Sequence, residues 1–297
     1  MFFSIIIPTY NNSDFLKKAI SSVENQTEKN YELIVIDNNS TDETSKIIQN
    51  CEVKNLIYEK INNSGIIAKS RNLGIKISKG DWLIFLDSDD LIYENKLYFL
   101  NKNLNNKFDL VCNAEKIINL DNNNVKIWRY GPLEVNMYKK MLINGNRFST
   151  SASAIKKDFI LKNKVFFNEN KDFVTAEDYD FFLNLVNKGA KVKFFKKVLG
   201  DHLFYQGSQS SNFQLHKKAV EKVLKFHVFK VQKFTSKKDK LWKSLTWRFI
   251  LMDFIKEFND KKFINSIKIL IILFYTAPIK ISFFLIKKFK RLITYDN

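Results

Sequence analysis

The chain contains little cysteine, proline and glycine, with 2 Cys, 3 Pro and 8 Gly among 297 residues. Two cysteines, Cys51 and Cys112, cannot build a disulfide framework, so the sequence suits a protein of the reducing cytosol. The low glycine and proline content is unusual for an α/β enzyme. The hydrophobic fraction of 45% is nevertheless enough for a sizeable core.

Long uninterrupted apolar runs are also missing. Residues 2–7 form a short apolar run that lacks a basic flank and stops at Pro8, so they do not predict a signal peptide. Residues 263–291 are apolar but contain Lys268, Pro278 and Lys280, whereas a spanning helix needs about 20 apolar residues. We expect an amphipathic element in the plane of a membrane surface, or alternatively a helix packed into the same domain. The residues expected at the lipid headgroups are Lys287, Lys288, Lys290 and Arg291.

Acidic residues are scarce in the last part of the chain. The formal net charge is +18, and residues 214–297 carry 20 Lys+Arg against 6 Asp+Glu, a net charge of +14. The preceding 213 residues carry only +4. This asymmetry indicates an anionic surface as partner, either a membrane or a nucleic acid. We therefore predict two parts, a domain over residues 1–213 and a basic helical extension over residues 214–297.

The first hundred residues alternate between strand and helix patterns. Four strand-like runs occupy residues 3–7, 32–36, 55–58 and 82–86. The helices between them begin near Ser13, at a capping box over residues 40–43, and at Ser64 with Gly80 as its stop. This order predicts an α/β fold with a mostly parallel, doubly wound sheet. Further strands are expected at residues 109–118, 125–130 and 191–198, and helices at 134–144, 177–188, 214–234 and 239–258.

An acidic cluster follows the fourth strand directly. Residues 82–86 are apolar, and Asp87, Ser88, Asp89 and Asp90 come next. Ligands of open α/β sheets bind at the carboxyl ends of the strands. Carboxylates there suit a divalent cation, and such a cation suits a diphosphate. The sequence therefore suggests a nucleotide-diphosphate substrate.

Other polar residues are expected at the same edge of the sheet. Pro8 ends the first strand and begins a polar run, and Asp37 ends the second, where it can accept a hydrogen bond from a nucleobase or ribose. Gly65 and Arg71 lie in a helix whose N-terminus favours phosphate. Residues 176–180 place acidic side chains in a first helical turn, either as helix-dipole partners or with one as a general base.

Together these segments resemble family 2 glycosyltransferases, which have the GT-A fold. The resemblance is carried by the Ile-Ile-Pro-Thr-Tyr-Asn opening, the Ile-Val-Ile-Asp segment, the Gly65 to Gly74 run, and the Phe-Leu-Asp-Ser-Asp-Asp motif. It resumes at residues 175–181. It implies a nucleotide-sugar-binding half over residues 1–100 and an acceptor half with the base over residues 101–213.

The resemblance also implies a role for each matching residue. Thr9 and Asp37 would hold the uracil and ribose, in a pocket shaped by Pro8 and Tyr10. The other positions are implied as follows: Arg71 near the diphosphate, Asp87 on the ribose or sugar side, Gly65 and Ser88 in the same nucleotide-sugar site, Asp89 on Mn²⁺ or Mg²⁺, and Asp178 as the catalytic base with Glu177 beside it.

The chain departs from the family pattern in the loop at residues 201–211. Many relatives have Tyr-Arg-x-His followed by Ser-x-Ser; here Tyr205 stands about where that His would be, and His202 lies three positions earlier. His202 can reach the metal or diphosphate as a neutral imidazole, or be a strand-end surface residue. The Ser-x-Ser pattern is present as Ser208 and Ser210. His216 and His227 are expected to have no chemical role.

The resemblance implies an inverting transferase that moves a sugar, most favourably from UDP, to a hydroxyl of a glycan or lipid-linked acceptor in cell-surface polysaccharide or lipooligosaccharide synthesis. We expect it to be peripheral on the cytoplasmic face of the inner membrane. Transfer to a polyprenyl phosphate is an alternative reaction. The apparent base at Asp178 argues mildly against it. Two alternatives come from other functional classes: a basic nucleic-acid-binding protein and a nucleotidyltransferase. A nucleotidyltransferase normally needs a glycine-rich loop after the first strand, and residues 8–12 contain no glycine. Acceptor specificity is expected in residues 110–176 and 200–215.

Overall fold

The structure is a computed structural model that describes residues 1–207, 212–278 and 281–282. The chain forms two compact units, Met1–Val223 and Leu224–Asn297. The predicted positions Ser208, Ser210, Lys287, Lys288, Lys290 and Arg291 lie outside the described residues.

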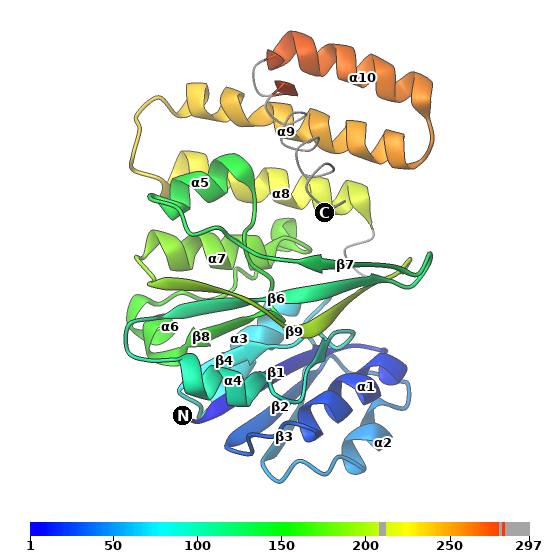
Figure 1. Ribbon diagram of the computed structural model, residues 1–297, viewed down its shortest axis with the longest axis vertical. Helices are drawn as coiled ribbons and strands as arrows, with labels where there is room; N and C mark the ends of the chain where they lie inside the picture. Colours follow the sequence, from blue (N-terminus) through cyan, green and yellow to red (C-terminus); the bar gives the residue numbers. More distant parts are fainter. Residues whose placement is uncertain (208–211, 279–280, 283–297) are drawn as a thin grey trace. The chain divides into compact units, whose positions relative to one another are not determined.

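The first unit is built on a sheet whose described strands follow the order β3-β2-β1-β4-β8-β6-β9-β5, with β7 paired to β6 (Figure 1). The first four strands are parallel, as predicted: β1 (Phe3–Thr9), β2 (Tyr31–Asp37), β3 (Leu56–Lys60) and β4 (Trp82–Phe85). All residues of β1, β2 and β4 are buried, because helices cover a parallel sheet on both faces. The helices of this half are α1 (Ser13–Glu24), α2 (Thr44–Gln49) and α3 (Ile67–Ile77).

The second half of the sheet mixes directions. Strand β6 (Leu110–Asn119) runs parallel to β9 (Val192–Phe204) and antiparallel to β8 (Ser153–Lys156) and β7 (Asn124–Trp128). The short strand β5 (Leu91–Ile92) pairs with the later part of β9. The helices here are α4 (Lys96–Asn103), α5 (Met137–Asn144), α6 (Lys157–Asn163), the 3₁₀ turn η1 (Lys171–Phe173) and α7 (Glu177–Asn187). This mixed half brings β9 and α7 to the edge where β1 and β4 end.

Spacing of apolar residues explains how the helices pack. In α1, Leu16, Ala19, Ile20 and Val23 are buried at helical spacing and join the core under β1 and β2. Loop regions bring polar groups to the strand ends while these apolar faces hold the layers together. The strands and the first helix predicted for the first half are therefore confirmed.

Three local predictions were wrong. The capping box does not form: α2 begins at Thr44, and Asp42 accepts hydrogen bonds from the Thr44 backbone N–H and hydroxyl. Gly80 does not cap α3, which ends at Ile77; it instead lies so close to Ser4 that a Cβ atom would come within 2.5 Å of the Ser4 nitrogen. The expected loop over residues 201–204 is part of strand β9.

Helix α8 (Phe213–Phe226) contains the boundary between the units. The second unit continues with a π-helical turn (His227–Val231), α9 (Lys238–Asn259) and α10 (Phe263–Thr276). Helices α9 and α10 lie side by side (Figure 1). Their contact is apolar and centres on the buried residues Leu251, Leu273 and Ile281. The division at Val223 lies ten residues after the predicted one at residue 213.

Candidate active site

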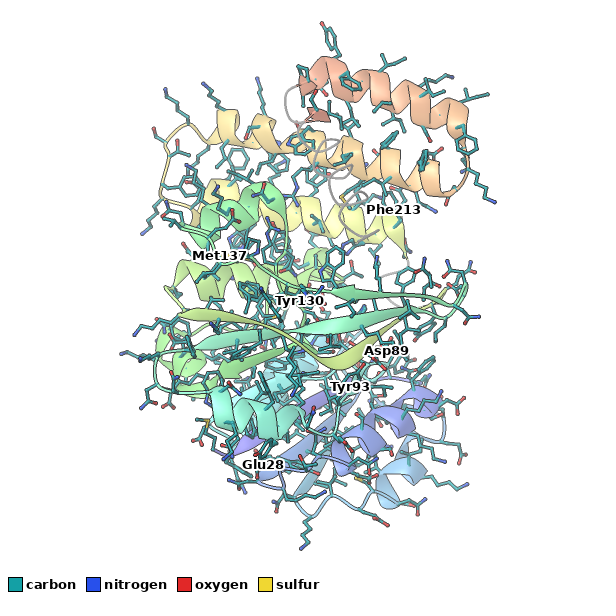
Figure 2. All side chains as sticks on the ribbon, viewed as in Figure 1. Glu28, Asp89, Tyr93, Tyr130, Met137 and Phe213 are labelled. Atoms are coloured by element: carbon teal, nitrogen blue, oxygen red, sulfur yellow. The ribbon has the colours of Figure 1, made fainter. Side chains whose placement is uncertain are left out.

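A cleft of about 820 Å³ opens at the carboxyl ends of the central strands. In open α/β folds this is the edge where ligands bind. Nearly all of the residues proposed from the sequence line it: Pro8, Thr9, Tyr10, Gly65, Arg71, Asp87, Ser88, Asp89, Glu177, Asp178 and His202. Figure 2 labels Asp89 on this edge of the sheet. Segments separated by more than 100 residues thus meet in one cavity.

Asp37 is the predicted site residue that does not line the cleft. Its carboxylate is fully buried and already accepts hydrogen bonds from the Ser40 N–H and hydroxyl and from the Tyr58 hydroxyl. Its neighbour Asn38 lines the cleft instead. The geometry therefore gives Asp37 a role in fixing the loop after β2, and its contact with a ribose or uracil stays a prediction.

The Thr9 hydroxyl belongs to the buried end of β1 and has no hydrogen-bond partner among the described residues. A buried donor without a partner is costly, so such a group is suited to a ligand. Tyr10, the next residue, is 58% exposed at the cleft. Strand β1 therefore offers a polar contact and an aromatic wall side by side.

Arg71 joins two parts of the site. It is buried in α3, and its guanidinium donates to Asp87 Oδ1 and to Glu177 Oε1, each at 2.7 Å. The ring of Phe167 lies 5.2 Å away. Burial opposes the charged form, but the two carboxylates dominate and raise the Arg71 pKa. Arg71 therefore neutralises acidic groups from β4 and α7 that would otherwise repel one another.

A serine- and threonine-rich segment before β8 holds the acidic loop. Thr150 donates to Asp87 Oδ2 at 3.0 Å, and the buried Ser151 hydroxyl donates to Asp90 Oδ2 at 2.6 Å while accepting from the Asp87 N–H. The fully buried ammonium of Lys96 donates to the Ser151 carbonyl. These supports were missed from the sequence; the run of hydroxyl residues at 149–151 was the available signal.

Asp89 is the member of the acidic cluster that contacts Tyr205 at the cleft. Its pKa is raised to about 7, mainly by burial and also by Asp90 and Asp87, against a lowering effect of His202. The hydroxyl of Tyr205 forms a hydrogen bond with Asp89, and the Tyr205 ring stacks on Phe15 at 4.8 Å. A carboxylate placed among like charges is stabilised by a cation.

His202 is oriented by Asp90. Its Nδ1 lies 3.0 Å from Asp90 Oδ2, and the side chain is about one-third exposed. Burial lowers its pKa, but the ion pair and hydrogen bond with Asp90, together with Glu115 and Asp87, raise it to about 10. Because Asp90 occupies Nδ1, the other ring nitrogen is the one left for a ligand. As an N–H it can donate to a phosphate, and it can coordinate a metal only after losing that proton. Carboxylates commonly orient metal-binding histidines in this way.

Asp178 lies in the first turn of α7 and lines the cleft. Its pKa is raised to about 7, mainly by burial and also by Glu177 and Asp87, whereas Arg71 lowers it. Its carboxylate accepts a hydrogen bond of 3.1 Å from the Asn146 side chain. Glu177 is held by Arg71 through one oxygen, whereas its other oxygen has no partner in the described structure. Asp178 is therefore the carboxylate suited to accept a proton near pH 7.

The sequence pattern described as Glycosyl transferase family 2 matches residues 4–167. The chain belongs to this family. The Staphylococcus aureus poly(ribitol-phosphate) beta-N-acetylglucosaminyltransferase TarP is 32% identical over 207 residues, 61% of this chain and 62% of TarP. The Escherichia coli UDP-Glc:alpha-D-GlcNAc-diphosphoundecaprenol beta-1,3-glucosyltransferase WfaP is 30% identical over 216 residues, 70% of this chain and 80% of WfaP. The chain spans less than two thirds of the length of TarP and of several other curated relatives.

The fold of this family 2 glycosyltransferase is also found in solved structures. S. aureus TarS 1–349, in complex with UDP-GlcNAc, superposes with a TM-score of 0.62 at 20% identity, over 94% of this chain and 82% of that one. At this identity the likeness concerns the fold alone. The predicted GT-A fold, a sheet flanked by helices with a helical C-terminal part, is confirmed. The sheet is entirely parallel only in its first half, because β8, β7 and β5 pair antiparallel to their neighbours.

The side chains that could ligate a metal in this family 2 glycosyltransferase suit Mn²⁺ or Mg²⁺ if the substrate supplies the remaining ligands. Among the described residues, no group of three or more His, Cys, Asp or Glu side chains is arranged to hold a metal. Asp89 and His202 nevertheless offer an oxygen and a nitrogen at the cleft. Sites of this kind bind the ion through one or two carboxylates together with substrate phosphates.

The described helices were also compared with the dimensions of a membrane. None of them combines the length and the apolar character that crossing a bilayer requires.

Proposed function

We propose that this chain is an inverting, metal-dependent glycosyltransferase. It moves a sugar from a nucleotide-diphosphate sugar, UDP-linked in the favoured case, to a hydroxyl of a glycan or lipid-linked acceptor in surface-polysaccharide or lipooligosaccharide synthesis. Family membership and the names of TarP and WfaP support the transferase class and this kind of acceptor. The UDP-GlcNAc held by TarS supports a UDP-sugar donor.

The observation that carries the proposal is Asp178. Its raised pKa, at a cleft that also contains the acidic loop, matches what a general base needs at neutral pH. In the proposed reaction, Asp178 accepts the proton of the acceptor hydroxyl. The acceptor oxygen forms a bond to the anomeric carbon, the bond from that carbon to the diphosphate breaks, and the nucleoside diphosphate leaves.

The remaining residues bind the donor. Thr9 and Tyr10 contact the base and ribose, with Pro8 turning the chain, while Gly65 and Ser88 line the diphosphate side. Arg71 contributes by cancelling the charge of Asp87 and Glu177, so that a diphosphate can enter an otherwise acidic cleft. Asp89 and His202 would hold the divalent cation. When bound, that cation would neutralise charge that develops on the departing diphosphate.

The raised pKa of Asp178 also bears on the acceptor. A phosphate acceptor is already ionised at neutral pH and needs no strong base, whereas a hydroxyl does. A carboxyl group whose pKa burial raises to about 7 therefore favours a hydroxyl acceptor over a polyprenyl phosphate.

The second unit is proposed to bind an anionic membrane surface from the cytoplasmic side. One face of α10 packs on α9, and the opposite face exposes large apolar side chains: Phe263, Ile264, Ile267, Ile271, Ile272, Phe274 and Tyr275. Residues 214–297, which contain this helix, carry a net charge of +14. Apolar side chains on a basic segment are typical of helices that lie in a membrane interface.

A screen of purified protein against nucleotide sugars with Mn²⁺ tests the proposed function. We expect slow hydrolysis of one UDP-sugar, detected as released UDP, because water can replace the acceptor. The matched control is the Asp178→Asn variant, which should release little UDP from the same sugar. Turnover of no nucleotide sugar, or equal turnover by both proteins, would contradict the proposal.

A further inference from the structure

Thr175 has an unusual backbone conformation directly before the catalytic helix. Its φ angle is +80°, a region that β-branched residues rarely adopt. Its hydroxyl is buried without a partner in the described structure. Ala176, the next residue, is the N-cap of α7, which presents Glu177 and Asp178. Strained backbone of this kind persists where surrounding groups hold it in place.

His216, from α8, holds Thr175. The imidazole Nδ1 lies 2.9 Å from the Thr175 carbonyl oxygen. A carbonyl can only accept, so Nδ1 must carry the proton and donate it. Burial lowers the pKa of His216 and so favours the neutral ring. Both residues line the same cleft as Asp178.

This contact comes from outside the segment that defines the family match. The matched region ends at residue 167, whereas His216 belongs to the last helix that begins in the first unit. The interaction therefore couples a later part of this chain to the turn from which the catalytic helix starts.

We propose that His216 is a positioning residue for the catalytic base. By donating to the Thr175 carbonyl it fixes the strained turn, and the turn sets the direction in which α7 presents Asp178 to the cleft. The proposal rests on the proposed function, in which Asp178 accepts the proton of the acceptor. Displacement of a reacting group by about 1 Å can cost about 100-fold in rate, so loss of the hydrogen bond acts on turnover more than on donor binding.

Three substitutions in the full chain test the role. His216→Ala removes the ring, and His216→Phe keeps a ring but no N–H donor. His216→Asn keeps a donor near the position of Nδ1. We expect kcat for UDP-sugar hydrolysis to fall about 10- to 100-fold in the Ala and Phe variants, with the donor KM within about twofold, and to recover largely in the Asn variant. Gln214→Ala, at an exposed position of the same helix, is the matched control.

Hydrogen–deuterium exchange gives a second result that does not require turnover. We expect the amides of residues 174–180 to exchange faster in the Ala and Phe variants and at the wild-type rate in the Asn variant. Wild-type kcat in the Phe variant, or an Asn variant as poor as Ala, would overturn the proposal. An increase in KM at unchanged kcat would instead make His216 a donor-binding residue. If the wild-type protein turns over no sugar, the proposed function fails, while the exchange rates still decide whether His216 holds the turn.

Discussion

Asp178 must be ionised to act as a base, and its surroundings oppose ionisation. Asp178→Asn keeps the shape of the side chain but cannot accept a proton. We expect kcat to fall about 10²–10⁴-fold, as is typical for the loss of a general base, with little change in UDP-sugar affinity. Steady-state kinetics and calorimetric titration with UDP separate the two effects. If affinity collapsed while the rate at saturation stayed the same, Asp178 would be a binding residue.

The raised pKa of Asp178 predicts a pH dependence of rate and stability. At saturating Mn²⁺, kcat/KM should fall about tenfold per pH unit below about pH 7, as the base becomes protonated. Because the pKa is about 7 in the folded state and near 3.8 in the unfolded state, ionisation lowers the free energy of unfolding as pH rises between these values. Asp178→Asn should therefore raise the melting temperature at pH 8, and less so at pH 5. If Asp178→Asn and the wild-type protein had the same melting temperature at pH 8, the charge of Asp178 would not be destabilising.

Asp89 is expected to be dispensable for folding but not for transfer. Asp89→Ala removes a ligand at the cleft whose pKa is already raised by burial and by neighbouring acids. We expect loss of most activity and an unchanged or slightly higher melting temperature. The exposed Asp14→Ala is the control for loss of a carboxylate. Full activity of Asp89→Ala, or of the wild-type protein in excess EDTA, would exclude the metal role.

Individual side chains were predictable from sequence where they follow a buried strand. Asp87, Ser88 and Asp89 follow β4 directly, so their place at the cleft could be inferred. The partners of Asp37 could not, because Ser40 and Tyr58 reach it through tertiary folding. Likewise no local pattern shows that Arg71 bridges two carboxylates.

At the scale of elements, the segment before β8 determines the shape of the acidic loop. Ser151→Ala removes one of the donors to Asp90 and the acceptor of the Asp87 N–H, so we expect a loss of about 1–3 kcal/mol in unfolding free energy together with weaker Mn²⁺ activation. Ser153→Ala is the matched control, because its buried hydroxyl donates to the Ser149 carbonyl rather than to Asp90. Denaturant melts and Mn²⁺ titrations of activity give the comparison. Equal Mn²⁺ activation in both variants would show that the loop does not depend on Ser151.

Most strands were predictable from the sequence, whereas β5, β8 and the end of β9 were not. Strands β1, β2 and β4 are continuous apolar runs, which single out buried parallel strands. Strand β5 has only two residues, and the four residues of β8, Ser-Ala-Ile-Lys, do not form an apolar run. Strand β9 continues through Asp201 and His202, whose polar side chains face binding partners in the site rather than an apolar core.

At the scale of the whole molecule, membrane binding can be separated from catalysis. Ile267 and Ile271 are 59% and 64% exposed, one turn apart on α10. We expect Ile267→Glu combined with Ile271→Glu to weaken binding to anionic liposomes while UDP-sugar hydrolysis is kept, because the proposed catalytic residues all lie before residue 215. Tyr98→Glu with Leu161→Glu, at exposed apolar positions of the first unit, controls for added charge. If the α10 variant co-sedimented with the liposomes as well as the wild-type protein does, this face of α10 would not be the membrane-binding surface.

The link from Arg71 to Glu177 also has a consequence for the order in which the protein matures. The two residues are 106 positions apart. At typical synthesis rates of about 5–20 residues per second, Arg71 leaves the ribosome about 5–20 s before Glu177 does. During that interval the first four strands can already pair, but the guanidinium still lacks one of its two carboxylates. The donor-binding half is therefore assembled early, and the site is completed only as α7 emerges.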